Sequence, residues 1–147
     1  MTQYPSERFA RGVANLAALG DDGETIFSSL AEVAPDLSRY VAEFAFGDLY
    51  SRPGLDLKQR QLLTIASLNA LGDCQPQLAF HMNLALNAGA SAEEIVETIL
   101  HCLAFVGFPR TYNSMRIAKQ VLGERGLLPV KAADPVAPAT AGSPRPA

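Results

Sequence analysis

Apolar residues recur along this chain at spacings of three and four positions, and the runs are broken at glycine and proline. That spacing places them on one side of an α-helix, and no stretch shows the alternation and turn signals of a β-hairpin. The pattern predicts an all-α, single-domain bundle of six to seven helices. We expect the helices at about residues 7–19, 24–33, 35–50, 57–71, 74–88, 92–106 and 110–124.

Local signals mark where several of these helices begin and end. Asp56 and Ser91 are each followed three residues later by glutamine or glutamate, which is the capping-box pattern of a helix N-terminus. Ser6 is a candidate N-cap for the first helix. Gly72 and Gly107 follow apolar runs, so we expect the fourth and sixth helices to end there.

The third and sixth helices are the two whose apolar residues say most about packing. The sixth is apolar around most of its circumference, which indicates a position inside the domain or between subunits. The third is expected to bury one side only. That apolar side consists of Leu37, Tyr40, Val41, Phe44 and Leu49.

Composition changes the picture at the surface and at the C-terminal end. Charged residues make up 18% of the chain and hydrophobic residues 48%. The charged share is low for a small monomer, so we expect other subunits to cover some apolar surface. Residues 127–147 hold five of the ten prolines and no aromatic residue, which predicts a disordered tail after a helical domain of residues 1–126.

Charge and hydropathy exclude several classes of partner. The net charge is −3 and there is no basic cluster, so we expect no nucleic-acid partner. The apolar runs are too short to span a bilayer, and the first residues lack the order of a signal peptide. We therefore expect a cytoplasmic protein without a membrane partner. Two cysteines and two histidines do not readily complete a metal site, and the cysteines are expected to be thiols.

The stretch 74–81 carries the most suggestive chemistry. Cys74 is expected in the first turn of the fifth helix, where the positive end of the helix dipole favours a thiolate. Gln77 and His81 follow it on the same face of the helix. His81 is a candidate acid or base near neutral pH. A buried apolar cysteine and a hydrogen-bonded core histidine are the alternative interpretations.

Other polar residues are weaker candidates. Glu43 lies among apolar residues and is a candidate acid or base, although periodicity alone points it outward. Arg52 could hold a substrate carboxylate by a two-point contact, or lie in solvent as a turn residue. Arg110 is a second candidate for anion binding. His101 follows Glu97 by one helical turn, and we interpret the two as a surface pair.

Residues 43–113 resemble the carboxymuconolactone decarboxylase family. The motifs that carry the resemblance are FGDLYSRPGLDLK, ALGDC, QLAFH ending at His81, LNAGAS and GFP. The resemblance implies an all-α subunit in a ring-like homo-oligomer, a trimer or a hexamer, and kinship to the alkylhydroperoxidase D-like proteins. It further implies a lyase without a cofactor that converts 4-carboxymuconolactone to 3-oxoadipate enol-lactone and CO2.

The chain departs from the family pattern at two positions. The alkylhydroperoxidase D-like relatives carry a C-x-x-C pair followed by histidine on this helix. Cys74 and His81 match that motif, but Gln77 stands where the second cysteine would be. Many family members have glutamate at the position of Gln61, and glutamine can orient a group but cannot titrate.

The resemblance suggests a role for each candidate in this reaction. We expect His81 to be the acid or the hydrogen-bond donor and Arg52 to hold a carboxylate. Glu43 is the replacement acid if Gln61 marks the loss of a proton carrier. The residues expected to shape or polarise the pocket are Cys74 and Gln77.

Two other functions stay open from the sequence. A thiol-dependent reductase or peroxidase would need Cys74, although Gln77 replaces the partner that closes a disulfide. A non-catalytic oligomeric ligand-binding protein would keep the fold and a pocket without turnover.

Overall fold

A computed structural model describes residues 6–28 and 31–131 of the chain. Within these residues the fold is all-α and contains no strand, as the apolar spacing predicts. Helix α3 runs directly into a π-helix, η1. The elements are α1 (Glu7–Ala18), α2 (Glu24–Ser28), α3 (Pro35–Tyr40), η1 (Val41–Leu49), α4 (Leu57–Leu71), α5 (Gln75–Asn87), α6 (Ala92–His101) and α7 (Leu103–Glu124).

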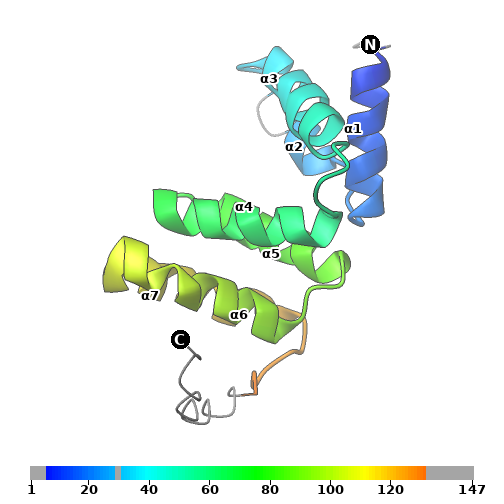
Figure 1. The fold of residues 1–147 in the computed structure, drawn as a ribbon. Coiled ribbons are helices and arrows are strands. Elements are labelled where there is room, and N and C mark those ends of the chain that lie inside the picture. The colour runs from blue at the N-terminus through cyan, green and yellow to red at the C-terminus, as the bar shows by residue number, and fades with distance from the viewer. Residues whose placement is uncertain (1–5, 29–30, 132–147) are drawn as a thin grey trace, which may run out of the picture.

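The N-terminal elements form a group at one end of the molecule. Figure 1 shows α1 beside the continuous α3–η1 helix, apart from the layered body made by α4 to α7. The backbones of α1 and η1 approach closely where each carries a glycine. A Cβ atom on Gly12 would lie 2.0 Å from the carbonyl oxygen of Ala42, and one on Gly47 would lie 2.4 Å from that of Arg8. These two helices can therefore pack in this way only if both positions lack a side chain.

The π-helix η1 overturns the predicted apolar side of the third helix. Its hydrogen bonds span five residues, as in the bond from the Tyr50 backbone N–H to the Ala45 carbonyl. A turn with more residues rotates the side chains away from the positions that 3.6-residue spacing assigns. The buried side of η1 contains Ala42, Phe46 and Gly47. The predicted side is largely exposed. Phe44 and Leu49 are its exposed members within η1, and Leu37 and Tyr40, also exposed, lie in α3 before it.

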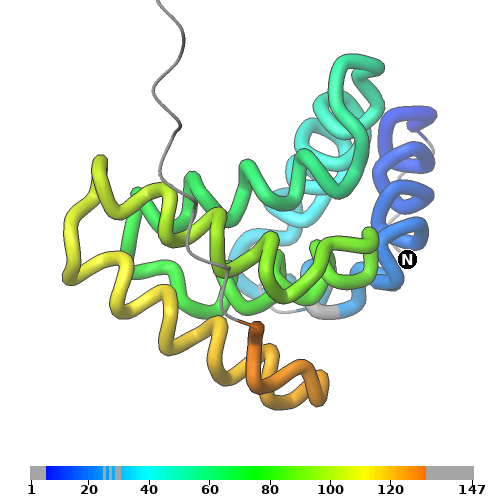
Figure 2. The backbone as a smooth tube through the Cα atoms, turned by 60° about the horizontal axis from the view of Figure 1, so that its bottom comes forward, coloured from blue at the N-terminus to red at the C-terminus, as the bar shows by residue number. Residues whose placement is uncertain are grey.

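Helices α4 to α7 form the main body. The three residues between α4 and α5 are enough for a tight turn only, so the two helices run back along each other. Figure 2 follows this pair and the α6–α7 pair packed against it. Their shared core is apolar and includes Ile65, Leu78, Met82, Ile95, Ile99 and Val121.

A second, smaller core joins the N-terminal group to this body. Leu16 and Leu19 of the α1 region and Phe46 of η1 pack around Leu84 of α5. The side-chain amide of Asn87 donates a hydrogen bond of 2.8 Å to the Leu19 carbonyl oxygen. The N-terminal group is thus anchored at the C-terminal end of α5.

The helix ends follow the sequence signals closely. Ser6 accepts a hydrogen bond from the Phe9 backbone N–H, and both predicted capping boxes form, at Asp56 and at Ser91. Gly72 ends α4 with a φ of 71°. These cap predictions are confirmed because each depends only on residues within one turn.

Three boundaries differ from the predictions. Helix α2 stops at Ser28, residues 31–33 form a turn, and residues 29–30 lie outside the described part. Helix α6 ends at His101 rather than at residue 106, and α7 begins two residues later. The predicted break at Gly107 occurs as a bend inside α7, where the φ is 76° and the ψ is 171°.

The predicted tail is placed only at its start. Residues 127–131 continue beyond α7, and Leu128 and Val130 line an apolar groove with Val96 and Tyr112. The prediction of disorder for residues 132–147 falls outside the described part of the chain. In the residues that are described, no helix combines the length and the apolar character needed to cross a membrane.

Candidate functional site

The centre of the candidate site is a contact between Gln61 of α4 and His81 of α5. The turn at residues 72–74 folds α5 back along α4 and brings two residues twenty positions apart together. The Nδ1 atom of His81 lies 2.8 Å from Oε1 of Gln61. With the amide oxygen of Gln61 turned toward the ring, Nδ1 carries the proton and donates it, because an amide oxygen only accepts hydrogen bonds. In a neutral ring the other nitrogen, Nε2, then holds a lone pair.

Burial keeps the His81 ring uncharged. Gln61 is 0% exposed and His81 is partly buried. The ring of Phe80 meets the His81 ring edge to face, with 5.2 Å between the centroids. Burial lowers the pKa of His81 from 6.5 to about 4, because water no longer solvates the imidazolium. The imidazole is therefore neutral at pH 7, and its protonated form is a stronger acid than an exposed imidazolium.

Two buried side-chain polar atoms of α4 have no hydrogen-bond partner among the described residues. They are Nε2 of Gln61 and Nε of Arg60. A buried unpaired N–H group costs about 1–3 kcal/mol, so such atoms are uncommon in a structure selected only for stability. Sequence analysis missed Arg60, although its place directly before Gln61 in the chain was a usable signal.

Arg52 lies in the exposed turn before α4. Its backbone carbonyl accepts a hydrogen bond of 2.6 Å from the guanidinium of Arg60. The Arg60 guanidinium also lies over the Tyr50 ring, 5.9 Å from its centroid. The turn that carries Arg52 is therefore tied to the residue next to Gln61, and the Arg52 side chain itself is exposed.

Cys74 occupies a different place from the one predicted. It is the N-cap residue of α5, with φ −129° and ψ 44°, and so lies outside the first helical turn. Its Sγ donates a hydrogen bond of 3.2 Å to the Leu68 carbonyl oxygen near the end of α4. The Cys74 thiol is thus hydrogen-bonded to the last turn of α4. Cys102 is also a free thiol and donates to the Thr98 carbonyl oxygen at 3.3 Å.

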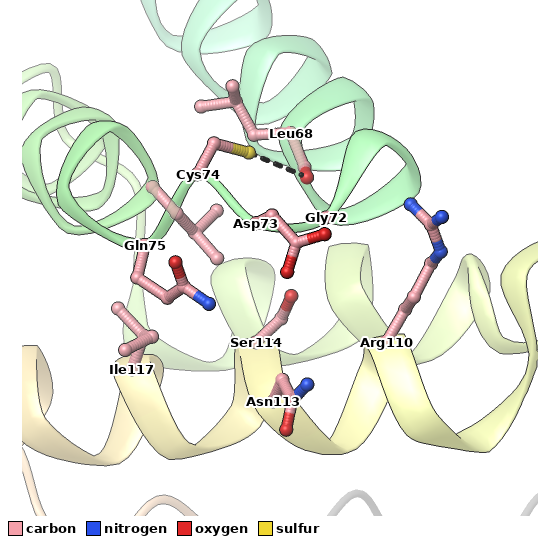
Figure 3. A pocket seen from close by; sticks show the side chains of 10 residues that line it. Leu68, Gly72, Asp73, Cys74, Gln75, Arg110, Asn113, Ser114 and Ile117 are labelled. Carbon is pink, nitrogen blue, oxygen red and sulfur yellow. Dashed lines mark hydrogen bonds between the residues drawn. The ribbon is translucent and has the colours of Figure 1, made fainter.

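The single stripe predicted for residues 74–81 is divided in the structure. Cys74 lines a cavity of about 100 Å³ between the α4–α5 turn and α7. Gln77 is exposed, and neither His81 nor Gln61 lines that cavity. Figure 3 shows the Cys74 sulfur directed at the Leu68 carbonyl, with Asp73 and Ser114 facing the same space.

Arg110 stands at the edge of this cavity as a helix cap. Its Nη1 donates to the backbone carbonyls of Ala70, at 2.5 Å, and Leu71 at the end of α4. Carbonyls at a helix C-terminus lack partners within the helix, and a cation there also complements the helix dipole. Its contacts therefore give Arg110 a structural role at the end of α4.

Glu43 is held inside the N-terminal group, contrary to the outward position that periodicity indicated. It is 7% exposed and accepts a hydrogen bond of 2.5 Å from the Ser6 hydroxyl. Arg39 and Arg8 lie 3.6 Å and 4.0 Å from its carboxylate. The structure thus brings Gln61 and His81 together and gives Glu43 a separate set of partners.

The remaining expectations concern His101 and metal ions. His101 is exposed and lies near the Phe105 ring, and among the described residues it forms no ion pair with Glu97. In the same part of the chain, no group of three or more histidine, cysteine or acidic residues is arranged to hold a metal ion.

Comparison with known proteins gives a consistent match. The model of the carboxymuconolactone decarboxylase family matches residues 35–120, which include both Gln61 and His81. The chain is 36% identical over 103 residues to 4-carboxymuconolactone decarboxylase of Acinetobacter baylyi, an overlap of 70% of the chain and 76% of that protein.

Two further relatives match the chain over fewer residues. An uncharacterized 15.0 kDa protein of the nqo9–nqo10 intergenic region of Paracoccus denitrificans is 36% identical over 97 residues, covering 65% of the chain and 72% of that protein. Nitrosuccinic acid decarboxylase of Metarhizium robertsii is 33% identical over 85 residues, covering 57% and 58%.

Proposed function

The chain belongs to the carboxymuconolactone decarboxylase family, and on that premise we propose that it is a decarboxylase, acting without a cofactor on 4-carboxymuconolactone or a similar lactone or keto acid. The observation that carries the proposal is the contact between Gln61 and a neutral, partly buried His81. Two relatives are named as decarboxylases, one of 4-carboxymuconolactone and one of nitrosuccinic acid.

The proposed reaction requires few catalytic groups. The bond from carbon to the leaving carboxylate breaks, and its electron pair spreads into the lactone carbonyl as a dienolate. A proton must then be delivered to carbon. Protonated His81 is the proposed donor, because a pKa of about 4 makes its imidazolium a stronger acid than an exposed histidine.

Substrate binding is the proposed role of the residues around this pair. Arg52 is exposed in a turn that Arg60 ties to α4, so it is suited to hold a second carboxylate of the substrate. Cys74 and Gln77 remain proposed pocket residues at the start of α5, where Cys74 lines a cavity separate from the Gln61–His81 contact. We leave Glu43 out of the mechanism, because Ser6 and two arginines already engage its carboxylate.

Direct assay tests the proposal. Purified protein is incubated with 4-carboxymuconolactone, and loss of substrate is followed together with release of CO2. We expect one CO2 and one 3-oxoadipate enol-lactone for each substrate consumed. The panel should include other carboxylated lactones, β-keto acids and nitrosuccinate, and the absence of CO2 release from every member would contradict the proposal.

The contacts of the two cysteines do not favour the thiol-dependent alternative. Each sulfur donates to a backbone carbonyl, and Gln77 occupies the position of a resolving cysteine. Hydroperoxide consumption that disappears in Cys74→Ser would nevertheless establish that activity.

We also propose that the chain forms a homo-oligomer. Phe105, Phe108 and Tyr112 lie at the start of α7 and are 78%, 76% and 68% exposed. Large exposed aromatic side chains so close in the sequence are typical of surfaces that subunits cover. Sedimentation should give the mass of a trimer or a hexamer, and Phe108→Asp should lower it. A monomeric wild type would contradict this prediction.

A further inference from the structure

The hydrogen bond between His81 and Gln61 determines whether the other ring nitrogen of His81 donates a hydrogen bond to a ligand or accepts one. Oε1 of Gln61 can only accept, so the proton of the neutral ring is held at Nδ1. The Nε2 atom is then an acceptor. A glutamate in place of Gln61 would add a negative charge here and favour a protonated ring, whereas glutamine adds none.

Charged groups on the neighbouring elements are engaged elsewhere. Arg60 of α4 donates to the Arg52 carbonyl, and Lys58 of α4 pairs with Glu94 of α6 at 2.9 Å. Among the described residues, no charged side chain forms a hydrogen bond or an ion pair with His81.

The same holds on the other sides of α5. Arg125, at the end of α7, donates to Asn83 and Asn87 of α5. Tyr50, after η1, shares a hydrogen bond of 3.3 Å with Thr64, and burial raises the pKa of its hydroxyl. Burial is therefore the cause of the neutral state of His81, and no neighbouring cation or anion sets it.

A carboxylate that reaches His81 meets a lone pair rather than an N–H group. Both a carboxylate oxygen and Nε2 are acceptors, so the two repel unless one proton lies between them. We propose that the site takes up its substrate carboxylate together with one proton, shared between His81 Nε2 and the carboxyl oxygen, and that Gln61 is the positioning residue that holds the ring's own proton at Nδ1. This inference rests on the proposed function, since it assigns the origin of the proton in that reaction.

The proton taken up at binding is the one that finally protonates carbon, so the reaction balances without a second proton donor. When the proton resides on Nε2, the substrate carboxylate is ionised and can leave as CO2. The electron pair of the broken bond enters the dienolate, and the proton then moves from Nε2 to carbon. The ring returns to its neutral form with Nδ1 still bonded to Gln61, and each turnover consumes one proton taken from solvent at binding.

The expected pH dependence of binding follows from the pKa values of His81 and of the carboxylic acid before they bind each other. Free His81 has a pKa of about 4. A free carboxylic acid also titrates at about 4, so neither partner carries the proton at pH 7. Affinity should therefore rise as the pH falls from 7 toward 5, by up to about tenfold per pH unit. It should level off near pH 4, where the free partners become protonated.

A non-reactive lactone acid tests this directly. 5-Oxotetrahydrofuran-2-carboxylate lacks the double bond that stabilises the carbanion, so it can bind without losing CO2. Calorimetric titration at pH 6.5 in buffers of different ionisation enthalpy measures proton uptake. We expect about one proton per ligand for the full-length wild type and for the control His101→Ala, and none for His81→Ala.

Two Gln61 variants separate positioning from a merely structural role. Gln61→Glu should raise the His81 pKa, because a carboxylate favours the imidazolium, and should lower proton uptake measured at pH 5.5. Gln61→Met keeps the volume but removes the acceptor. Long-range ¹H–¹⁵N NMR should locate the His81 proton on Nδ1 in the wild type, and this preference should disappear in Gln61→Met.

The outcomes distinguish this inference from the proposed function. Zero proton uptake, failure of the lactone acid to bind, or a wild-type His81 protonated on Nε2 would overturn the inference, even if 4-carboxymuconolactone is turned over. Uptake of one proton without turnover of any substrate would support it and would overturn only the proposed reaction.

Discussion

Replacing His81 with alanine is expected to slow decarboxylation by about 100- to 10,000-fold, the usual contribution of a positioned proton-transfer group. The ring is the titratable group at the centre of the site, and its low pKa fits it to release a proton to carbon. The loss should appear in kcat, because the proton is transferred in the reaction itself. Steady-state assays of the wild type and the variant on the same substrate measure it.

The matched control for this experiment is His101→Ala. The chain has two histidines, and His101 is the exposed one. We expect the control to keep wild-type kcat, and circular dichroism should show that both variants remain helical. Full activity of His81→Ala in a folded protein would remove His81 from the mechanism and leave the family assignment intact.

Helix ends could be predicted because their causes are local. Ser6, Asp56 and Ser91 each bond to a backbone N–H three residues away, and the sequence contains both partners. The glycines that break helices act in the same way, since positive φ values at Gly72 and Gly107 depend on the missing Cβ. These features follow from short-range chemistry and needed no tertiary information.

The buried face of η1 could not be predicted in this way. Apolar spacing assumes 3.6 residues per turn, and a π-helix changes that number. The packing of α1 against η1 also depends on small residues, Gly12 and Gly47, rather than on large apolar ones. A method that weights hydrophobic side chains therefore selects Tyr40 and Phe44, which lie on the exposed side.

The sequence predicted which residues make up the candidate site, but only part of how they are arranged. Sequence analysis named both His81 and Gln61, yet the contact between them depends on the register of α4 against α5. That register is set by the turn at residues 72–74, where Gly72 and Asp73 both have positive φ. The same turn places Cys74 outside the helix and separates it from His81, which spacing along one ideal helix could not reveal.

Adding a single methyl group at Gly12 is expected to destabilise the protein by about 3 kcal/mol, at the upper end of overpacking costs. In an exposed helix, glycine to alanine normally stabilises by about 0.5–1 kcal/mol. At this position the sign should reverse, because the new Cβ would lie 2.0 Å from the Ala42 carbonyl oxygen. The obstacle is backbone, so α1 and η1 must move apart and loosen the core around Leu16.

Thermal unfolding of Gly12→Ala measures this effect, and Gly54→Ala is its matched control. A Cβ on Gly54 would have no atom within 4 Å, so the control should unfold at the wild-type temperature. For Gly12→Ala we expect the Tm to fall by about 10 °C. Because the Gln61–His81 contact lies between α4 and α5, the His81 NMR signals below the transition should keep their wild-type pKa. A Tm equal to or above that of the wild type would show that α1 and η1 do not pack through their glycines.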